Sequence, residues 1–446
     1  MSLKKPLKWL IAIVVALLTL LALLIGVAYW LLHTDTPDVA ERDAPLVPRL
    51  SGDYPGAPRT VDAEQLLSWA ERATPMARIN TATDSLPNGL ALSMLPFMVD
   101  WEQSRTEGDS PFLLMRNVNA GGNPVIGENI LATVRIPLDG LSGLHWCLTP
   151  TRNDKGKDTF MGHAMLRFLF SKEKRPVILG QDGQPLPGAL APDDLMLSWE
   201  AWRPPMTSYD GLKGLDPESY TLSARAYTGA QRFLTDIVRG NPWRCYPVKL
   251  PEVDNALPLT LLTATLSGDT FARRIIGEMA AKGQIKAEGL RQATPAQRER
   301  VKSLFATSRL PKDPLSGLLQ KANLSYQLLE RSCITESLAM IQLSLDRIHK
   351  EHDLGPPPKL ELVPSGLPPW IQELVTADHA TLLAHVPGTL LFVARNRQVL
   401  PIQAYRILEE AGLLLPNPSS DADGPLMYYY DKSSGMPYGS IKDNMM

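Results

Sequence analysis

The hydrophobic pattern of this chain begins with an unbroken apolar segment at residues 9–32. At about 1.5 Å of rise per residue, a helix of this length crosses a hydrocarbon core of roughly 30 Å. Lys4, Lys5 and Lys8 precede the segment, so the positive-inside rule places residues 1–8 in the cytoplasm and the rest of the chain outside. The pattern therefore predicts a single-pass anchor in a bacterial inner membrane, with most of the chain in the periplasm.

A cleavable signal peptide is the alternative for this segment, because Gly26, Val27 and Ala28 offer candidate cleavage positions. The apolar part of a signal peptide typically spans about 7 to 15 residues. Here the apolar run continues through Leu31 and Leu32, past the candidate cut. The length favours a retained anchor, and whether the segment is cleaved stays open.

The polar and apolar pattern then predicts a linker followed by a β-rich domain. Residues 33–60 are rich in Pro, Asp and Gly and have no apolar period, which favours an extended linker. Residues 61–255 predict a mixed domain in which strands dominate. Its clearest strands are 130–136, which is β-branched and partly alternating, and 195–202, in which both faces are partly apolar. Residues 176–184 predict a strand that enters an Asp-Gly turn.

Helical signals become frequent near Pro217, and residues 256–355 are predicted to be mainly α-helical. A first helix is expected to end at Arg239, because Gly240 and Pro242 follow it in the order typical of a helix C-terminus.

Two further helices are predicted downstream. Asp269 is expected to cap a helix at 270–282. Apolar residues at helical spacing predict a long helix at 314–352, which is either continuous or bent near 332–335. The pattern does not choose between these two forms.

The last part of the chain, residues 356–446, predicts a small α/β region. A helix is expected at 401–411 with Gly412 at its end, and a strand at 427–431. The predicted fold class is therefore an N-terminal transmembrane helix followed by an α+β ectodomain. That ectodomain has a β-rich mixed first half, a mainly α-helical second half and a small α/β C-terminal element.

Composition limits the classes of function. The chain has 446 residues, of which 44% are hydrophobic and 21% charged, so a folded protein with a sizeable core is expected. The net charge is only −2, and we therefore expect no nucleic-acid partner. The expected partners are the membrane, through residues 9–32, and an envelope protein or glycan. Residues 271–331 carry more basic than acidic residues and offer one candidate contact surface.

The three cysteines predict one disulfide. Cys147 and Cys245 lie in Trp/Pro-rich segments that read as irregular structure, and in an oxidising compartment such a pair is normally bonded. Three buried reduced thiols are the alternative, because three cysteines allow three pairings. Cys333 falls at a core position of the predicted long helix.

The search for catalytic motifs is mostly negative. The common signatures of hydrolases, zinc proteases and nucleotide-binding proteins are absent from the sequence, and neither a cofactor nor a metal site is expected. His349, His352 and Asp353 lie within one helical turn and form the densest cluster of possible metal ligands. Their position at a helix C-terminus fits solvated end groups better than ligands.

Clustered aromatic residues give the candidate binding residues Trp146, Trp199, Trp202, Trp243 and His145. Exposed tryptophans on an irregular scaffold would suit a groove for a sugar or a peptide. Core packing around the disulfide is the alternative. If a groove exists, its polar groups are expected among Asp100, Glu102, His145 and His163.

Two functional hypotheses follow from the sequence. The first is a non-catalytic binding or organising component of the bacterial cell envelope, because no catalytic constellation is evident. The alternative is an envelope hydrolase that acts on glycan or peptide through carboxylates in the Trp-rich half.

Overall fold

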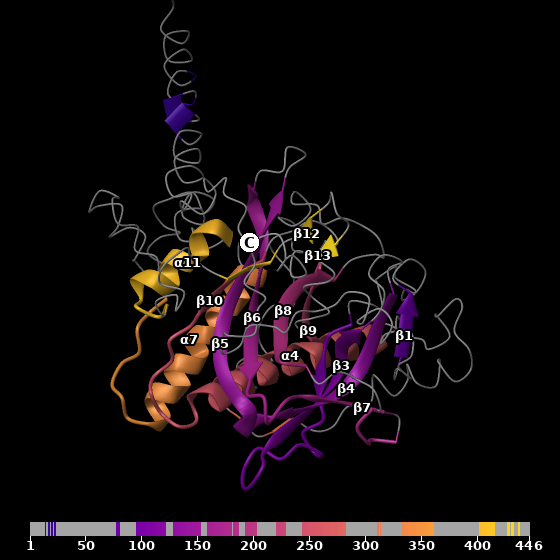
Figure 1. Ribbon diagram of the computed structural model, residues 1–446. Helices are drawn as coiled ribbons and strands as arrows, with labels where there is room; N and C mark the ends of the chain where they lie inside the picture. Colours follow the sequence, from indigo (N-terminus) through magenta and orange to yellow (C-terminus); the bar gives the residue numbers. More distant parts are fainter. Residues whose placement is uncertain are drawn as a thin grey trace, which may run out of the picture.

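The framework of this protein is a large mixed β-sheet packed against helices (Figure 1). The structure is a computed structural model. The residues described are 77–80, 95–121, 128–152, 158–180, 182–186, 192–202, 220–228, 243–281, 332–360, 401–414, 426–428, 430–431 and 436–437, with single positions at 14, 17, 19, 20, 22, 23, 310, 311 and 313.

Eleven strands form the sheet. They are β1 (Ala77–Asn80), β2 (Met98–Val99), β3 (Phe112–Gly121), β4 (Glu128–Pro137), β5 (Leu141–Arg152), β6 (Asp158–Phe170), β7 (Val177–Leu179), β8 (Asp194–Trp202), β9 (Thr221–Thr228), β10 (Trp243–Pro247) and β11 (Leu426–Tyr428). A short 3-10 helix, Leu138–Gly140, joins β4 to β5, and a separate two-stranded ribbon pairs β12 (Tyr430–Asp431) with β13 (Met436–Pro437).

Nine of the eleven strands follow one another in the order β1-β4-β3-β9-β8-β6-β5-β10-β11, while β2 pairs with β3 and β7 with β4. The pairing of β3 with β9 is parallel, and the other ladders of this sheet are antiparallel. β11 comes from the end of the chain and joins the sheet beside β10. The C-terminal region therefore shares the sheet with the first half of the protein.

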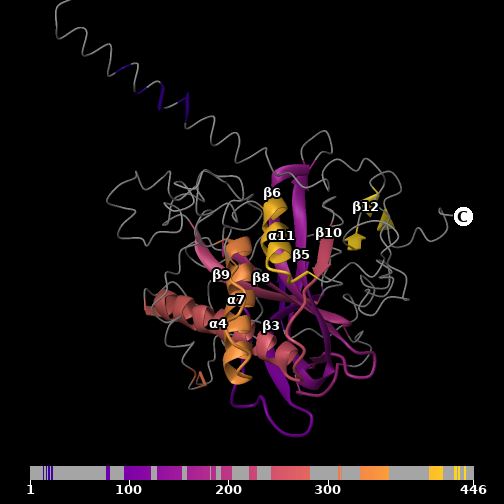
Figure 2. The same cartoon turned by 90° about the vertical axis from the view of Figure 1, so that its left-hand side faces the viewer.

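Three α-helices lie in the described part of the chain: α4 (Ala256–Ala281), α7 (Cys333–Glu351) and α11 (Pro401–Glu410). Figure 2 shows α7 crossing α4 in front of the sheet. The close approach of α4 depends on Gly268, because a Cβ atom there would lie 2.2 Å from Cζ of Phe97. The buried threonines of α4 meet their hydrogen-bond needs locally, each hydroxyl donating to a carbonyl one turn earlier: Thr260, Thr263, Thr265 and Thr270.

The central strands have one apolar face and one mostly polar face, because side chains alternate along a strand. The apolar face belongs to the buried core and carries Leu166 and Phe168 of β6, Leu197 and Trp199 of β8, and Leu222, Ala224 and Ala226 of β9. α4 and α7 contribute their own apolar residues to the same core, including Leu261, Ile341 and Leu345.

The start of α7 is fixed by a capping box. The Ser332 hydroxyl accepts from the Thr335 amide, and the Thr335 hydroxyl accepts from the Ser332 amide. This arrangement makes Cys333 the first residue of the helix. The structure shows a helix start within 332–335, and residues 314–331 lie outside the described residues.

The predicted transmembrane helix at residues 9–32 requires a correction. No helix in the part of the chain that the structure describes combines the length and the apolar character needed to span a bilayer. The long helices that are described carry charges such as Asp269 and Arg273 in α4 and Arg347 in α7, and they pack against the sheet. This finding also overturns the inner-membrane location inferred from residues 9–32. Most of that segment lies outside the described residues; its six described positions are helical.

The predicted fold class is wrong in its balance of helix and strand. The described part of the chain is mainly one mixed sheet with three α-helices. Residues 221–228 lie in the stretch that was expected to turn helical near Pro217, but they alternate between polar and apolar and form β9. The expected helix end at Arg239 lies outside the described residues. Asp269 does not cap a helix but lies in the middle of α4. Cys147 and Cys245 lie in regular strands, not in irregular segments.

Several local predictions are confirmed. The strands at 130–136 and 195–202 correspond to β4 and β8, and β8 is buried at every position. The strand and turn at 176–184 are β7 and a turn in which Gly183 has a φ of +74°. The helix at 401–411 is α11, followed by Gly412 with a φ of +67°. The linker at 33–60 lies outside the described residues.

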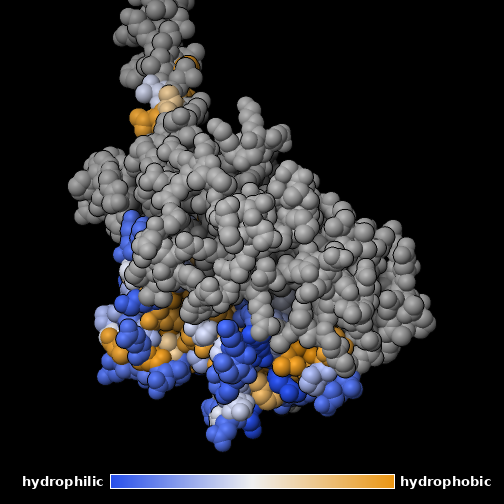
Figure 3. Space-filling view, viewed as in Figure 1, coloured by the Kyte–Doolittle hydropathy of each residue, from blue (hydrophilic) through white to orange (hydrophobic). Residues whose placement is uncertain are grey.

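The described surface in Figure 3 is mostly hydrophilic with smaller hydrophobic areas between. The loop between β2 and β3, at the bottom of Figure 1, projects from this face and carries exposed polar residues such as Glu107 and Asp109.

Candidate functional site

Three of the predicted binding tryptophans are core residues. The side chains of Trp146, Trp199 and Trp202 are fully buried. The indole Nε1 of Trp146 donates to Oγ of Ser337, 3.0 Å away, which ties β5 to α7. A stacking face must be open to its ligand, so these rings serve packing in this structure. Trp243 lies in β10 opposite Tyr428. A role of these residues in binding stays a prediction.

His145 is also buried, with 6% of its surface exposed. It faces Arg167 across the β5–β6 ladder, and Arg167 in turn forms a buried ion pair with Asp194 at 2.5 Å. Burial, and after it the positive charge of Arg167, lowers the pKa of His145 to about 3. His145 is therefore a neutral imidazole at physiological pH.

The predicted disulfide is confirmed. Cys147 of β5 and Cys245 of β10 are direct partners in the β5–β10 ladder, and their sulfur atoms are bonded. Cys333 is the remaining free thiol, and it is buried at the start of α7.

The polar face of the central strands carries several ionisable and hydroxyl side chains. It carries His163 of β6, Ser198 and Glu200 of β8, and Ser223, Arg225 and Tyr227 of β9, which share one face by the register of the ladders. Of the four polar residues singled out from the sequence, only His163 belongs to this group. Asp100 and His145 are buried elsewhere, and Glu102 is exposed.

His163 is the centre of this group. Its Nε2 atom lies 2.7 Å from Oγ of Ser198 and 3.4 Å from Oε1 of Glu200. The β6–β8 ladder runs from Met165 and Ser198 to the strand ends at Leu169 and Asp194, so His163 lies just beyond its last pair. At that point the two strands no longer share backbone bonds, and the side chain of His163 is 19% exposed.

Cys333 completes the arrangement from α7. Its thiol hydrogen-bonds to the His163 imidazole. Burial lowers the pKa of His163, but the charge of Cys333, the hydrogen bonds to Cys333 and Glu200, and the charge of Glu200 outweigh it and raise the pKa to about 9. His163 is thus an imidazolium at neutral pH, held between a sulfur and a carboxylate.

Glu200 is held firmly by its neighbours. It accepts hydrogen bonds from the Ser198 hydroxyl at 2.9 Å, the Tyr227 hydroxyl at 2.8 Å and Nη1 of Arg225 at 3.0 Å. The Arg225 guanidinium also lies over the Tyr227 ring, 4.7 Å from its centroid. These contacts bind the carboxylate from β9 and keep it directed at His163.

A thiol, an imidazole and a carboxylate therefore meet at one point of the fold. A cysteine at a helix N-terminus and beside an imidazolium favours the thiolate form, which is the reactive one. A histidine whose orientation is fixed by a third group is the usual partner of such a nucleophile. The arrangement is suited to nucleophilic attack by sulfur with proton transfer through His163.

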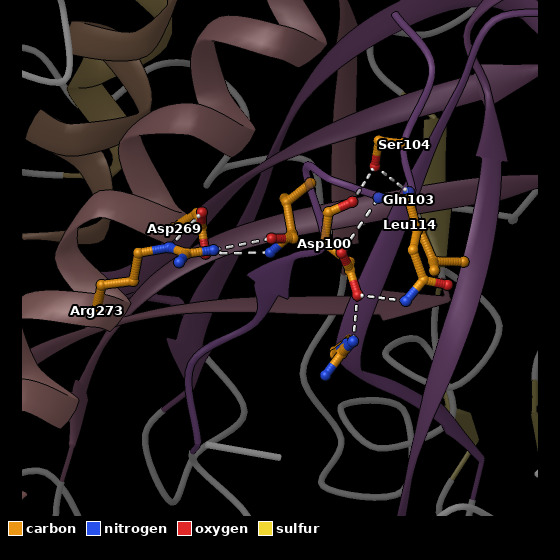
Figure 4. A network of polar contacts seen from close by, with 8 residues as sticks. Asp100, Gln103, Ser104, Leu114, Asp269 and Arg273 are labelled. Carbon is orange, nitrogen blue, oxygen red and sulfur yellow. Dashed lines mark hydrogen bonds and ion pairs between the residues drawn. The ribbon is translucent and has the colours of Figure 1, made fainter. Parts of the chain in front are cut away.

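A second polar network, shown in Figure 4, has a structural role. The buried Asp269 of α4 accepts from the Val99 amide, Nε1 of Trp101 and Nε of Arg273 at 3.1, 2.6 and 2.8 Å. Burial raises the pKa of Asp269 against the lowering effects of Arg273, Trp101 and Val99. The network thereby ties α4 to the segment that follows β2.

The neighbouring Asp100 holds the loop that precedes β3. It pairs with Arg116 and accepts from the amide and the side chain of Gln103, while Ser104 donates to its carbonyl and accepts from the Leu114 amide (Figure 4). All of these partners lie within one hairpin, so Asp100 stabilises the loop.

In the cluster of possible metal ligands at the end of α7, each of the two histidines contacts a different protein group. Nδ1 of His349 lies 3.0 Å from the Gly355 carbonyl oxygen, and Nε2 of His352 lies 2.6 Å from Oδ1 of Asn255. No group of three possible metal ligands occurs among the described residues.

The chain matches no known family, curated protein or solved structure. The site at His163 therefore has to be interpreted from its own geometry. Sequence reasoning missed Cys333 and Glu200 as functional candidates. Alternating polar residues along β8 and β9 are the signal that marks this face, because a strand buried on both sides seldom carries Glu and Arg without partners.

Proposed function

We propose that this protein is a cysteine-dependent enzyme of acyl transfer, with Cys333 as nucleophile and His163 as its proton-transfer partner. The observation that carries the proposal is the hydrogen bond between the Cys333 thiol and His163, whose imidazole is held from the other side by Ser198 and Glu200. His163 comes from β6, Ser198 and Glu200 come from the neighbouring β8, and Cys333 comes from a helix start, so the fold itself assembles the group.

The chemistry follows from the ionisation of the pair. The Cys333 thiolate adds to the carbonyl carbon of an ester, thioester or amide, and the carbonyl electrons move onto its oxygen. When the carbon–oxygen, carbon–sulfur or carbon–nitrogen bond to the leaving group breaks, His163 gives that group its proton. The acyl group then remains on sulfur as a thioester. Water or another acceptor attacks this thioester, His163 takes the proton of the acceptor, and the thiolate is restored.

Glu200 supports both states of His163 without contacting the acyl group. Its charge lies beside the imidazolium and stabilises it, and its contacts to Arg225 and Tyr227 prevent it from turning away. This role matches that of the third group in other nucleophile and histidine pairs.

The proposal differs from both hypotheses drawn from the sequence. The hydrolase hypothesis placed catalysis on carboxylates in the Trp-rich half, whereas the nucleophile proposed here is a thiol and comes from α7. The hypothesis of a non-catalytic binding or organising component stays a prediction, and the two differ in a measurable way. A purely structural Cys333 is an unreactive thiol, while a nucleophile reacts readily below neutral pH.

Alkylation of the native protein separates these cases. We expect iodoacetamide to label Cys333 in the folded wild type near pH 6, at least tenfold faster than an ordinary exposed thiol, as read by mass spectrometry of the Cys333 peptide. The His163→Gln variant loses this excess reactivity, and the Ser344→Ala variant retains it because Ser344 lies further along α7 and bonds its own helix. Circular dichroism verifies folding of each variant. A folded wild type that is not labelled, or is labelled only as the pH approaches that of an ordinary thiol, overturns the proposal.

A further inference from the structure

The hydrogen bonds around Ser198 determine which nitrogen of His163 carries a proton. A serine hydroxyl has one hydrogen and can donate only one hydrogen bond. The Ser198 hydroxyl donates to Oε1 of Glu200, at 2.9 Å. Its oxygen must therefore accept from Nε2 of His163, at 2.7 Å.

Glu200 cannot reverse this direction. Tyr227 donates to the same Oε1 atom and Arg225 donates to Oε2, so the carboxylate acts only as an acceptor. The chain of donors thus runs one way, from Nε2–H of His163 through the Ser198 hydroxyl to Glu200. All three side chains are largely buried, and Ser198 is fully buried.

We propose that Ser198 is a positioning residue that holds the proton on Nε2 of His163, so that Nδ1 is the nitrogen that exchanges a proton with the Cys333 sulfur. Only the catalytic role of this arrangement rests on the proposed function. The tautomer itself is a property of the three residues and can be measured without any substrate.

Among the described residues, the groups that face His163 support the same assignment. From α7 it is faced by the Cys333 thiol, from β8 by Ser198 and Glu200, and through Glu200 by Arg225 and Tyr227 of β9. On β5 its cross-strand partner is Thr149, a neutral residue. Two acceptors, Ser198 and Glu200, lie near Nε2. When the imidazolium loses a proton, the proton on Nε2 is therefore retained and the proton on Nδ1 leaves.

Nitrogen-15 NMR of labelled histidine tests the assignment in the full chain. In the wild type we expect the neutral form of His163, populated at about pH 10, to carry its proton on Nε2, with a slowly exchanging Nε2–H signal. In Ser198→Ala the two tautomers mix, the Nε2–H signal is lost to exchange, and the pKa of His163 falls by about one unit because one hydrogen bond to the imidazolium is gone. Ser198→Thr keeps a hydroxyl and restores the wild-type signals.

Ser344→Ala is the matched control, because it also removes a buried serine hydroxyl but one that bonds within α7. An Nδ1–H tautomer in the wild type, or an unchanged tautomer and pKa in a folded Ser198→Ala variant, overturns this inference. Neither result decides the outcome of the Cys333 alkylation, which is a separate measurement. If Cys333 is unreactive while the Nε2–H tautomer is observed, the proposed function fails and the assignment stands.

Discussion

Cys147 and Cys245 lie directly opposite each other in the β5–β10 ladder, and their disulfide joins positions 98 residues apart in the chain. The bond connects two strands that are already paired, so its main effect falls on the unfolded chain. Chain-entropy reasoning assigns a loop of this size about 4 to 5 kcal/mol of stabilisation.

We therefore expect the Cys147→Ala/Cys245→Ala double variant to lose about 3–5 kcal/mol of unfolding free energy, measured by urea denaturation. A reducing agent lowers the midpoint of the wild type and leaves that of the variant unchanged. Alkylation of the denatured, unreduced wild type labels only Cys333, and reduction adds the other two cysteines. A wild-type midpoint that does not respond to reduction contradicts the prediction.

The contacts of Asp269 predict a large loss of stability when its carboxylate is removed. Asp269→Ala leaves the Val99 amide, the Trp101 indole and the Arg273 guanidinium without their shared acceptor. Arg273 is only 12% exposed, and the substitution removes the Asp269 carboxylate that neutralises its charge while its hydrogen bond to the Val99 carbonyl remains. We expect a loss of about 3–5 kcal/mol in the free energy of unfolding.

Asp346→Ala is the control for this change, since Asp346 is exposed on α7 and accepts only from Gln342 at the surface. That substitution should change the free energy of unfolding by no more than about 0.5 kcal/mol. Equal effects of the two substitutions would show that the buried network contributes little.

The pKa of His145 predicts an acid-sensitive fold. Burial and the charge of Arg167 hold this pKa near 3, while the unfolded chain has an ordinary value near 6.5. Between these values the unfolded state binds a proton that the folded state does not. Stability therefore falls as the pH drops from about 6.5 towards 3, by up to about 1.4 kcal/mol for each pH unit.

Replacement of the imidazole tests this effect. His145→Gln removes the part of the acid sensitivity that His145 causes, as measured by urea unfolding at about pH 4 to 7. His349→Gln, at the end of α7, should keep the wild-type slope. A slope that is the same in His145→Gln and in the wild type assigns the acid sensitivity to other groups.

The sequence predicts parts of this fold well where local patterns decide the structure. The alternation in residues 195–202 identified β8, and Gly412 after an amphipathic segment identified the end of α11. The Cys147–Cys245 pair followed from the number of cysteines and their surroundings, although the flanking Trp and Pro residues suggested irregular structure where the chain forms strands.

The errors arise where the same local signal fits two structures. Helical signals were expected from near Pro217, but the segment at 221–228 is a strand because Leu222 and Ala224 pack on the core. Asp269 resembles a cap, yet the helix continues through it because α4 buries both of its neighbouring turns.

The candidate site could not be predicted from local patterns because its residues are distant in sequence. His163 and Glu200 meet only when β6 and β8 pair, and Cys333 reaches them only when α7 packs on the same strands. None of the three residues lies in a recognisable motif. What brings them together is sheet order, a long-range property that periodicity does not encode.

The coupling between His163 and Cys333 gives the last prediction. The pKa of His163 is raised to about 9 in the folded state, against about 6.5 in the unfolded chain, and Cys333 supplies the largest raising contribution. The imidazolium therefore contributes stability that is fully present below about pH 6.5 and is lost as the pH rises through about 9. In Cys333→Ala the largest raising contribution is absent, so the pKa of His163 falls, although Glu200 still raises it.

We expect the wild type to be more stable than Cys333→Ala at pH 7, and the difference to shrink by about 1–3 kcal/mol between about pH 7 and 10. Urea unfolding of both proteins at matched pH measures this difference. Titrations that the two chains share cancel, whereas the ionisation of the Cys333 thiol, which only the wild type carries, is part of the measured coupling. NMR titration of His163 in each protein gives the two pKa values independently. Stability curves that stay parallel over this range, with His163 titrating alike in both proteins, would show that the thiol and the imidazole do not form an ion pair.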